Sequence, residues 1–194
     1  MRALISAAVF AAPLLAARAD ESAPALRETL QDGVYQLVGG FEVAADPHLV
    51  WAVLTDFDSM PHYVPSIRSS VPETASDGGL VVVQQFEGKA FIFTRTINVR
   101  MTIQEQPERQ IAFQDVAAKD FDTYQGSWQV QSLDGGTRVV YRLTAKPRGA
   151  VPGILGRGAF KDGAVQMLSE LRAEMVRRSA RQIHPETNSE GGTK

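Results

Sequence analysis

Cysteine is absent from the 194 residues of this chain. Its absence excludes disulfide bonds, a catalytic thiol and every metal site built on thiolate ligands. Histidine is almost as scarce. The three that occur, His48, His62 and His184, lie too far apart in the sequence to match the ligand spacing of a zinc site. We therefore expect no bound metal and no cofactor.

A strong excess of charge of either sign is also missing. The sequence has 20 Lys and Arg residues against 22 Asp and Glu residues, a formal net charge of −2. Nucleic-acid-binding domains usually carry a clear positive excess, so we do not expect a nucleic acid as the main partner. The G-x-S-x-G motif of many hydrolases does not occur, and no Ser/His/Asp group can be assembled. The sequence thus carries no signature of nucleophilic catalysis.

Long hydrophobic runs are lacking too, and the clearest short one lies at the start of the chain. Arg2 precedes the apolar run 3–15, and Ala17 and Ala19 place small residues where a signal peptidase cleaves. The run is too short to span a bilayer. We therefore expect residues 1–19 to be a cleaved signal peptide and the mature protein to be periplasmic. An uncleaved anchor is the alternative.

The chain does contain a series of segments in which apolar and polar residues alternate, the pattern of half-buried β-strands. Short turns separate these segments, among them the hairpin signal Asp134-Gly135-Gly136, so neighbouring strands should pair antiparallel. The predicted strands cover residues 34–43, 67–74, 80–88, 91–103, 110–116, 123–132 and 138–146.

Helical signals complete the predicted order. Asp46-Pro47 supplies an N-cap and a first-turn proline for one short helix, and a second short helix is expected around 59–63. Residues 154–181 have the apolar spacing of a long amphipathic helix. We predict an α+β helix-grip fold, a seven-stranded curved antiparallel sheet wrapped around this helix. The domain would span residues 33–182, with a polar leader at 20–32 and a disordered tail at 183–194.

Four pieces of the chain, taken in order, resemble the START/polyketide-cyclase superfamily, also called SRPBCC or the birch-pollen-allergen fold. They are residues 41–51 around Asp46-Pro47, residues 53–65, Gly126-Ser127-Trp128 with the hairpin 135–138, and Val151-Pro152 before the long helix. The resemblance spans most of residues 34–178. It implies an internal cavity, which members of the superfamily use to carry lipids, bind hormones or quinones, or cyclise polyketides. Fold alone does not choose among these activities.

One charged residue interrupts the apolar face of the strand 91–103. An unpaired buried guanidinium is costly, so Arg95 should meet an acid, reach solvent or line a cavity. If the hairpin turns at residues 89–90, Gln84 lies across from Arg95 and Asp115 about one diagonal step away. Two interpretations stay open: an internal ion pair, or an anchor for the anionic or carbonyl end of an apolar ligand.

In the later strands, aromatic residues occupy the same alternate positions as the apolar residues and therefore face the same side of the sheet. Core packing is the plain interpretation. One helix cannot fill a strongly curved sheet completely, however, so the same side chains would line the remaining space. The ten residues predicted to contact a ligand are Gln84, Phe91, Phe93, Arg95, Phe113, Asp115, Tyr124, Trp128, Tyr141 and Met167.

These features favour an exported, monomeric carrier that holds a small hydrophobic ligand, such as a lipid, an isoprenoid or a polyketide-like compound, without covalent chemistry. A cyclase or dehydratase of the same fold, with Arg95 and Asp115 as its polar centre, is the alternative. A module that assists a partner is the third hypothesis. Basic residues at the end of the long helix would then touch that partner or, transiently, a membrane surface, although such a run is more often a solvated face. They are Arg172, Arg177, Arg178 and Arg181.

Overall fold

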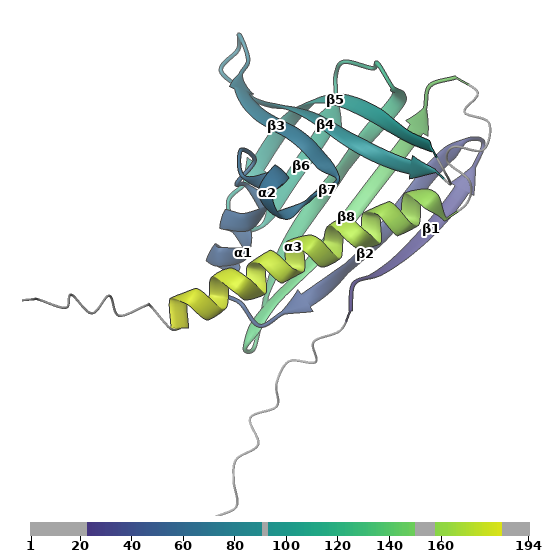
Figure 1. Ribbon diagram of the computed structural model, residues 1–194. Helices are drawn as coiled ribbons and strands as arrows, with labels where there is room; N and C mark the ends of the chain where they lie inside the picture. Colours follow the sequence, from purple (N-terminus) through teal and green to yellow (C-terminus); the bar gives the residue numbers. More distant parts are fainter. Residues whose placement is uncertain (1–22, 91–92, 150–157, 184–194) are drawn as a thin grey trace, which may run out of the picture.

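The computed structural model describes residues 23–90, 93–149 and 158–183, which form eight strands and three helices. All strands pair antiparallel in one sheet of order β1-β2-β8-β7-β6-β5-β4-β3. In Figure 1, α3 crosses one face of the curved sheet, and α1 and α2 lie beside its C-terminal part. The predicted helix-grip fold is confirmed. The strands are β1 (Ala25–Gln31), β2 (Val34–Val43), β3 (Ile67–Thr74), β4 (Leu80–Ala90), β5 (Phe93–Gln106), β6 (Gln110–Asp115), β7 (Phe121–Leu133) and β8 (Gly136–Pro147); the helices are α1 (Pro47–Leu54), α2 (Met60–Tyr63) and α3 (Ala159–Ile183).

Helix α1 begins where the sequence predicts. The Asp46 side chain accepts a hydrogen bond from the His48 backbone N–H at 2.7 Å, and Pro47 occupies the first turn. Proline costs nothing there, because the first N–H groups of a helix have no partner within the helix. Val50 and Val53 then turn inward and are fully buried.

The sheet has one strand more than the sequence predicted. Residues 20–32 were expected to be a polar leader, but Ala25–Gln31 forms β1 and pairs with β2. Asp32 and Gly33 join the two strands with φ values of 51° and 76°, as in a two-residue type I′ hairpin turn. Leu26 is only 7% exposed. The folded domain therefore includes residues before position 33.

The hairpin between β4 and β5 turns later than predicted. Residues 89–90 still belong to β4 and pair with residues 93–94 of β5, so that Gln84 pairs with Val99, and Arg95 pairs with Gly88. The predicted pairing of Gln84 with Arg95 is therefore wrong. The physical reason is that this segment has no Asn-Gly or Asp-Gly turn signal, so the long strands set the position of the turn. The shift is an even number of residues, which preserves the alternation between the two faces.

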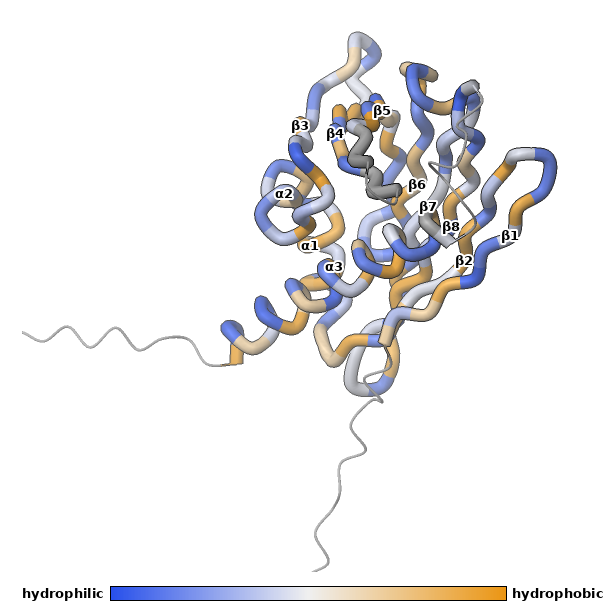
Figure 2. The backbone as a smooth tube through the Cα atoms, turned by 45° about the vertical axis from the view of Figure 1, so that its right-hand side comes forward, coloured by the Kyte–Doolittle hydropathy of each residue, from blue (hydrophilic) through white to orange (hydrophobic). Residues whose placement is uncertain are grey.

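Helix α3 packs one apolar stripe against the concave face of the sheet. The stripe has the three- and four-residue spacing of an amphipathic helix. In Figure 2, apolar and polar residues alternate along the strands that it faces. No helix within the described ranges is both long and apolar enough to cross a membrane. The buried residues of the stripe are Ala164, Leu168, Leu171 and Met175.

Candidate ligand-binding cavity

Two adjoining cavities lie between α3 and the concave face of the sheet. The first, beside α1 and α2, has a volume of about 60 Å³ and is called the α1-side cavity here. The second, beside the first turns of α3, has a volume of about 130 Å³ and is called the α3-start cavity. The side chains that line both form the partition between them: Ile67, Gln84, Tyr124, Tyr141 and Met167.

The α1-side cavity is apolar apart from this partition. The segment from α1 through α2 covers it with Leu54, Phe57, Met60 and Val64. The sheet and α3 supply the remaining wall: Met101, Ile103, Ile111, Phe113, Trp128 and Leu171.

The α3-start cavity is apolar within and polar at its rim. Gly163 of α3 is exposed to solvent and also lines the cavity, so the cavity reaches the surface there. Glu87 lies at the same rim and forms an ion pair with Arg68 at 2.6 Å. The apolar wall consists of Leu37, Phe86, Ile97, Leu143, Phe160 and Ala164.

Gln84 is the buried amide of the partition, with 9% of its surface exposed. Its Nε2 donates to the Ser70 hydroxyl at 3.0 Å and to the Met60 sulfur at 3.5 Å. A thioether sulfur only accepts hydrogen bonds, which identifies the atom facing Met60 as the nitrogen. Among the described residues, both side-chain hydrogen bonds of Gln84 use Nε2, which leaves the carbonyl oxygen for other partners.

Tyr124 and Tyr141 place two phenol groups beside this amide. Burial raises the pKa of Tyr124 to about 12, although its interaction with the Tyr141 side chain acts in the opposite direction. Burial also raises the pKa of Tyr141, and the interaction with Tyr124 raises it further. Both side chains are thus neutral at physiological pH.

Neighbouring rings hold the two tyrosines in position. Trp128 packs on Tyr141 with ring centroids 4.4 Å apart, and Phe121 packs on Tyr124 at 4.8 Å. Phe113 contacts both tyrosines, at 5.9 Å and 6.4 Å. Such contacts add to burial and fix the direction of the hydroxyl groups.

Six of the ten predicted ligand contacts line one or both cavities: Gln84, Phe113, Tyr124, Trp128, Tyr141 and Met167. Phe91 lies outside the described residues. Phe93 and Arg95 are placed in β5 by their backbone, and their side chains are outside the described part of the molecule. Whether these three contact a ligand therefore stays a prediction.

Asp115 is not a neighbour of Arg95, contrary to prediction. It pairs with Met101, six residues or roughly 20 Å further along β5. Its carboxylate accepts hydrogen bonds from the backbone N–H groups of Arg100, Ala117 and Ala118 at 2.8 to 3.1 Å. Asp115 holds the turn that follows β6. The prediction failed because the register of the β5–β6 hairpin, in which Gln106 pairs with Gln110, places Asp115 opposite Met101.

Sequence reasoning missed several lining residues. Phe160 was placed on the apolar stripe of the long helix but not in the cavity, although its seven-residue spacing from Met167 puts both on one helical face. Leu54, Phe57 and Met60 come from the α1–α2 segment, whose position over the sheet depends on long-range contacts. Local sequence carries no signal for that position.

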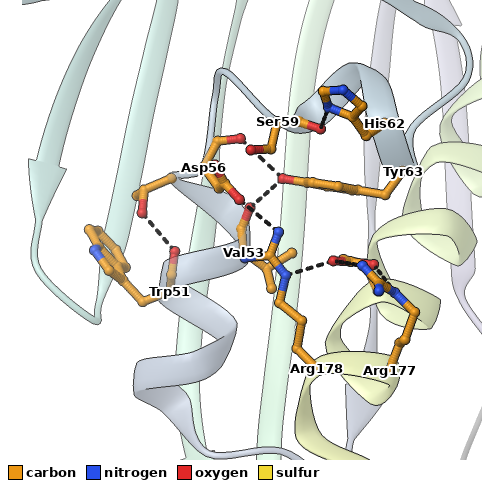
Figure 3. Close-up of polar contacts among 10 residues, drawn as sticks. Trp51, Val53, Asp56, Ser59, His62, Tyr63, Arg177 and Arg178 are labelled. Atoms are coloured by element: carbon orange, nitrogen blue, oxygen red, sulfur yellow. Dashed lines mark hydrogen bonds and ion pairs between the residues drawn. The ribbon is translucent and has the colours of Figure 1, made fainter. Parts of the chain in front are cut away.

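The α1–α2 segment is fastened to α3 by a group of ion pairs, drawn in Figure 3. Arg178 lies 2.7 Å from Asp56 and 2.6 Å from Glu174, which also pairs with Arg177. The Tyr63 hydroxyl donates to the backbone oxygens of Val53 and Asp56. Two of the four basic residues that the sequence suggested for a partner or membrane surface thus have acidic partners within the fold.

Metal binding has no support in the side-chain geometry. No cluster of three or more His, Asp or Glu side chains that could hold a metal ion occurs within the ranges 23–90, 93–149 and 158–183.

The sequence and the fold are similar to those of known proteins at the level of family and architecture. The model of the family described as polyketide cyclase / dehydrase and lipid transport matches residues 43–172. No curated protein matches the sequence.

Solved structures share the architecture at low identity. The STAR-related lipid transfer protein from Xanthomonas axonopodis is 16% identical, with 79% of this chain and 99% of that chain covered and a TM-score of 0.59. The Zhui aromatase/cyclase from Streptomyces sp. R1128 is 20% identical, with 82% and 99% covered and a TM-score of 0.60. A START superfamily protein from Mycobacterium smegmatis is 16% identical, with 74% and 98% covered and a TM-score of 0.63. At such low sequence identity, the TM-scores show a common fold and nothing finer.

Proposed function

We propose that this chain, which belongs to the polyketide cyclase / dehydrase and lipid transport family, is a non-catalytic carrier of a small hydrophobic ligand such as a lipid, an isoprenoid or a polyketide-like compound. One observation carries the proposal: apolar side chains of α3 and the sheet surround two adjoining cavities that they do not fill. Protein interiors are normally packed to crystal density, and unfilled apolar volume lowers stability. A bound apolar ligand would fill that volume and make the missing packing contacts.

A cyclase or dehydratase activity is the second candidate, because one of the similar solved structures is an aromatase/cyclase. Acid–base catalysis works best with a group that titrates near the working pH. The pKa values of Tyr124 and Tyr141 are raised by burial, so both stay protonated at neutral pH. Asp115 is occupied by three backbone N–H groups. These observations favour binding over catalysis.

Export, oligomeric state and surface contacts are further parts of the proposal. A cleaved signal peptide at residues 1–19 would deliver a monomer to the periplasm. Transient membrane contact would involve Arg181 and the exposed side of Arg177, since Arg178 is held between Glu174 and Asp56. N-terminal sequencing of the protein from the host's exported fraction, followed by light scattering, tests the first two points. A chain that still begins at Met1 would contradict export with cleavage.

The carrier function is tested by native mass spectrometry of protein purified from the exported fraction of its own host. We expect a stoichiometric adduct that gentle ionisation preserves and denaturation releases. Met167→Trp, which adds volume to the partition, should lose the adduct. Gln166→Trp, on the exposed side of α3, is the matched control and should keep it. Absence of any adduct, together with no binding of a hydrophobic dye, would contradict the carrier function.

A further inference from the structure

The polar groups of the partition stand between two apolar spaces. Gln84, Tyr124 and Tyr141 line both cavities, whereas the walls on either side of them are aliphatic and aromatic. A ligand that spans the partition must match these groups, because a buried polar group without a hydrogen bond costs free energy. The polar part of such a ligand therefore lies in its middle and not at one end.

The partition offers one hydrogen-bond acceptor. Among the described residues, the hydrogen bonds of Gln84 all run through Nε2, to Ser70 and Met60. Its carbonyl oxygen Oε1 is then the atom that meets the ligand. An amide oxygen accepts from a hydroxyl group, and it repels a carboxylate oxygen.

The partition also offers one donor. Tyr124 and Tyr141 both line the two cavities, and burial raises the pKa of each, so their hydroxyl groups stay protonated. A protonated phenol hydroxyl can donate a hydrogen bond as well as accept one. Tyr124 is therefore able to donate to a hydroxyl or carbonyl oxygen of the ligand.

The volumes limit the apolar parts of the ligand. An engineered apolar cavity of about 150 Å³ takes up benzene. The α3-start cavity, at about 130 Å³, matches one ring, and the α1-side cavity, at about 60 Å³, matches a short alkyl group. Two long acyl chains would require both cavities to expand.

We propose that the ligand is a small neutral molecule with a central hydroxyl group that binds Gln84 and Tyr124, or a central carbonyl group that binds Tyr124 alone, with a ring in the α3-start cavity and a short alkyl group in the α1-side cavity. The proposal specifies the ligand class of the carrier function and depends on that function. It also differs from an anionic ligand anchored by Arg95, the interpretation that the sequence left open.

Four probes of nearly equal size test the polar match by calorimetry on the mature protein. They are 1-phenyl-1-propanol, propiophenone, propylbenzene and 2-phenylbutanoate, which carry a hydroxyl, a carbonyl, no polar group and a carboxylate. We expect the alcohol and the ketone to bind about tenfold more tightly than the hydrocarbon, as one satisfied hydrogen bond allows. The carboxylate should bind more weakly than the alcohol.

Single-residue variants test which side chains distinguish the four probes. Tyr124→Phe should remove the advantage of the ketone over the hydrocarbon, and Gln84→Leu should reduce the advantage of the alcohol. Propylbenzene affinity should stay within about twofold in Tyr124→Phe, because only a hydroxyl is removed. Gln85→Leu, next to Gln84 but bonded to Asn98, is the matched control and should change nothing. The four-probe comparison on the unaltered protein stands by itself if a variant fails to fold.

Three results would overturn the ligand class. Equal affinity for all four probes would contradict the hydrogen bonds at the partition. Tightest binding of 2-phenylbutanoate, lost in Arg95→Leu, would assign the polar anchor to Arg95. Binding of palmitate but of none of the four probes would exclude a small ligand and leave the carrier function intact. Only the absence of any binding, with palmitate and a hydrophobic dye included, would also contradict the proposed function.

Discussion

The two ends of α3 differ in how they are held. Toward its C-terminus, Leu168, Leu171 and Met175 are almost completely buried, and Glu174, with 3% of its side chain exposed, binds two arginines. Near its start, Gly163 is exposed beside the α3-start cavity. One helix thus combines a well-packed end with an end that borders open space.

The start of α3 is fastened mainly by contacts at the surface. The Glu28 carboxylate of β1 accepts the backbone N–H groups of Gly158 and Lys161 at 3.3 and 3.1 Å. Phe160 stacks on Tyr35 with centroids 4.7 Å apart. Local opening is least costly where few buried contacts are lost. We therefore expect the stability of the fold to depend on the C-terminal end of α3 and the exchange of ligand to depend on its start.

The largest difference between the ends is expected for a truncation in the packed half. Leu168→Ala should lower the free energy of unfolding by about 3 kcal/mol, because Leu168 is fully buried and leaves a cavity. Met167→Ala, one residue earlier but half-buried and already beside both cavities, should cost about 1 kcal/mol. Urea denaturation measures both. Equal losses would show that the two faces of α3 are packed alike.

The ion pairs of the packed end should have the next largest effect. Glu174→Gln removes the charge that Arg177 and Arg178 share and should lower the free energy of unfolding by about 2 kcal/mol. The control is Glu73→Gln, which breaks the exposed pair with Arg100 and should cost less than about 0.5 kcal/mol. A similar cost for both variants would mean that burial adds nothing to the Glu174 network.

Local signals made most elements predictable from the sequence. The Asp46 cap sets the start of α1, and a period of two places Tyr124 and Tyr141 on the inner face of their strands. Strand β1 was missed even though Asp32-Gly33 is a hairpin signal, because the strand before it is short and mostly polar. Such a strand is recognisable only by its pairing with β2.

Relations between strands were less predictable. The position of Arg95 relative to Gln84 depends on where the β4–β5 hairpin turns, which no local turn signal specifies. The position of Asp115 relative to Arg95 depends on the register of the β5–β6 hairpin. An even shift in register keeps every residue on its face but changes its neighbours. The alternation along the strands therefore predicted that Gln84, Tyr124 and Tyr141 face the cavities, but the sequence failed to predict which polar groups meet there.

Acid should weaken the packed end selectively. Burial alone would raise the pKa values of Asp56 and Glu174, but their arginine partners outweigh it and lower both pKa values. A carboxyl group whose pKa is lower in the folded than in the unfolded protein stabilises the fold at every pH above its unfolded-state pKa, which lies near 4. That stabilisation is lost as the pH falls through the folded-state pKa. We expect the free energy of unfolding to fall by about 1 kcal/mol more in the unaltered protein than in Glu174→Gln between pH 5 and the acid limit of folding. Parallel curves would contradict the lowered pKa of Glu174.

The smallest effect on stability, with the clearest effect on ligand exchange, is expected at Gly163. A Cβ atom added there meets no atom within 4 Å and the residue is exposed, so Gly163→Leu should fit and should stabilise α3 by about 0.5 to 1 kcal/mol through helix propensity. Gly163→Ala gives nearly the same gain with little added volume and is the matched control. Because Gly163 lies where the α3-start cavity reaches the surface, leucine should slow the association of propiophenone several-fold relative to alanine. Stopped-flow tryptophan fluorescence, to which Trp128 in the cavity wall contributes, measures the rate. Equal rates in the two variants would place the route of entry elsewhere, and the open start of α3 would then be a packing feature without a part in exchange.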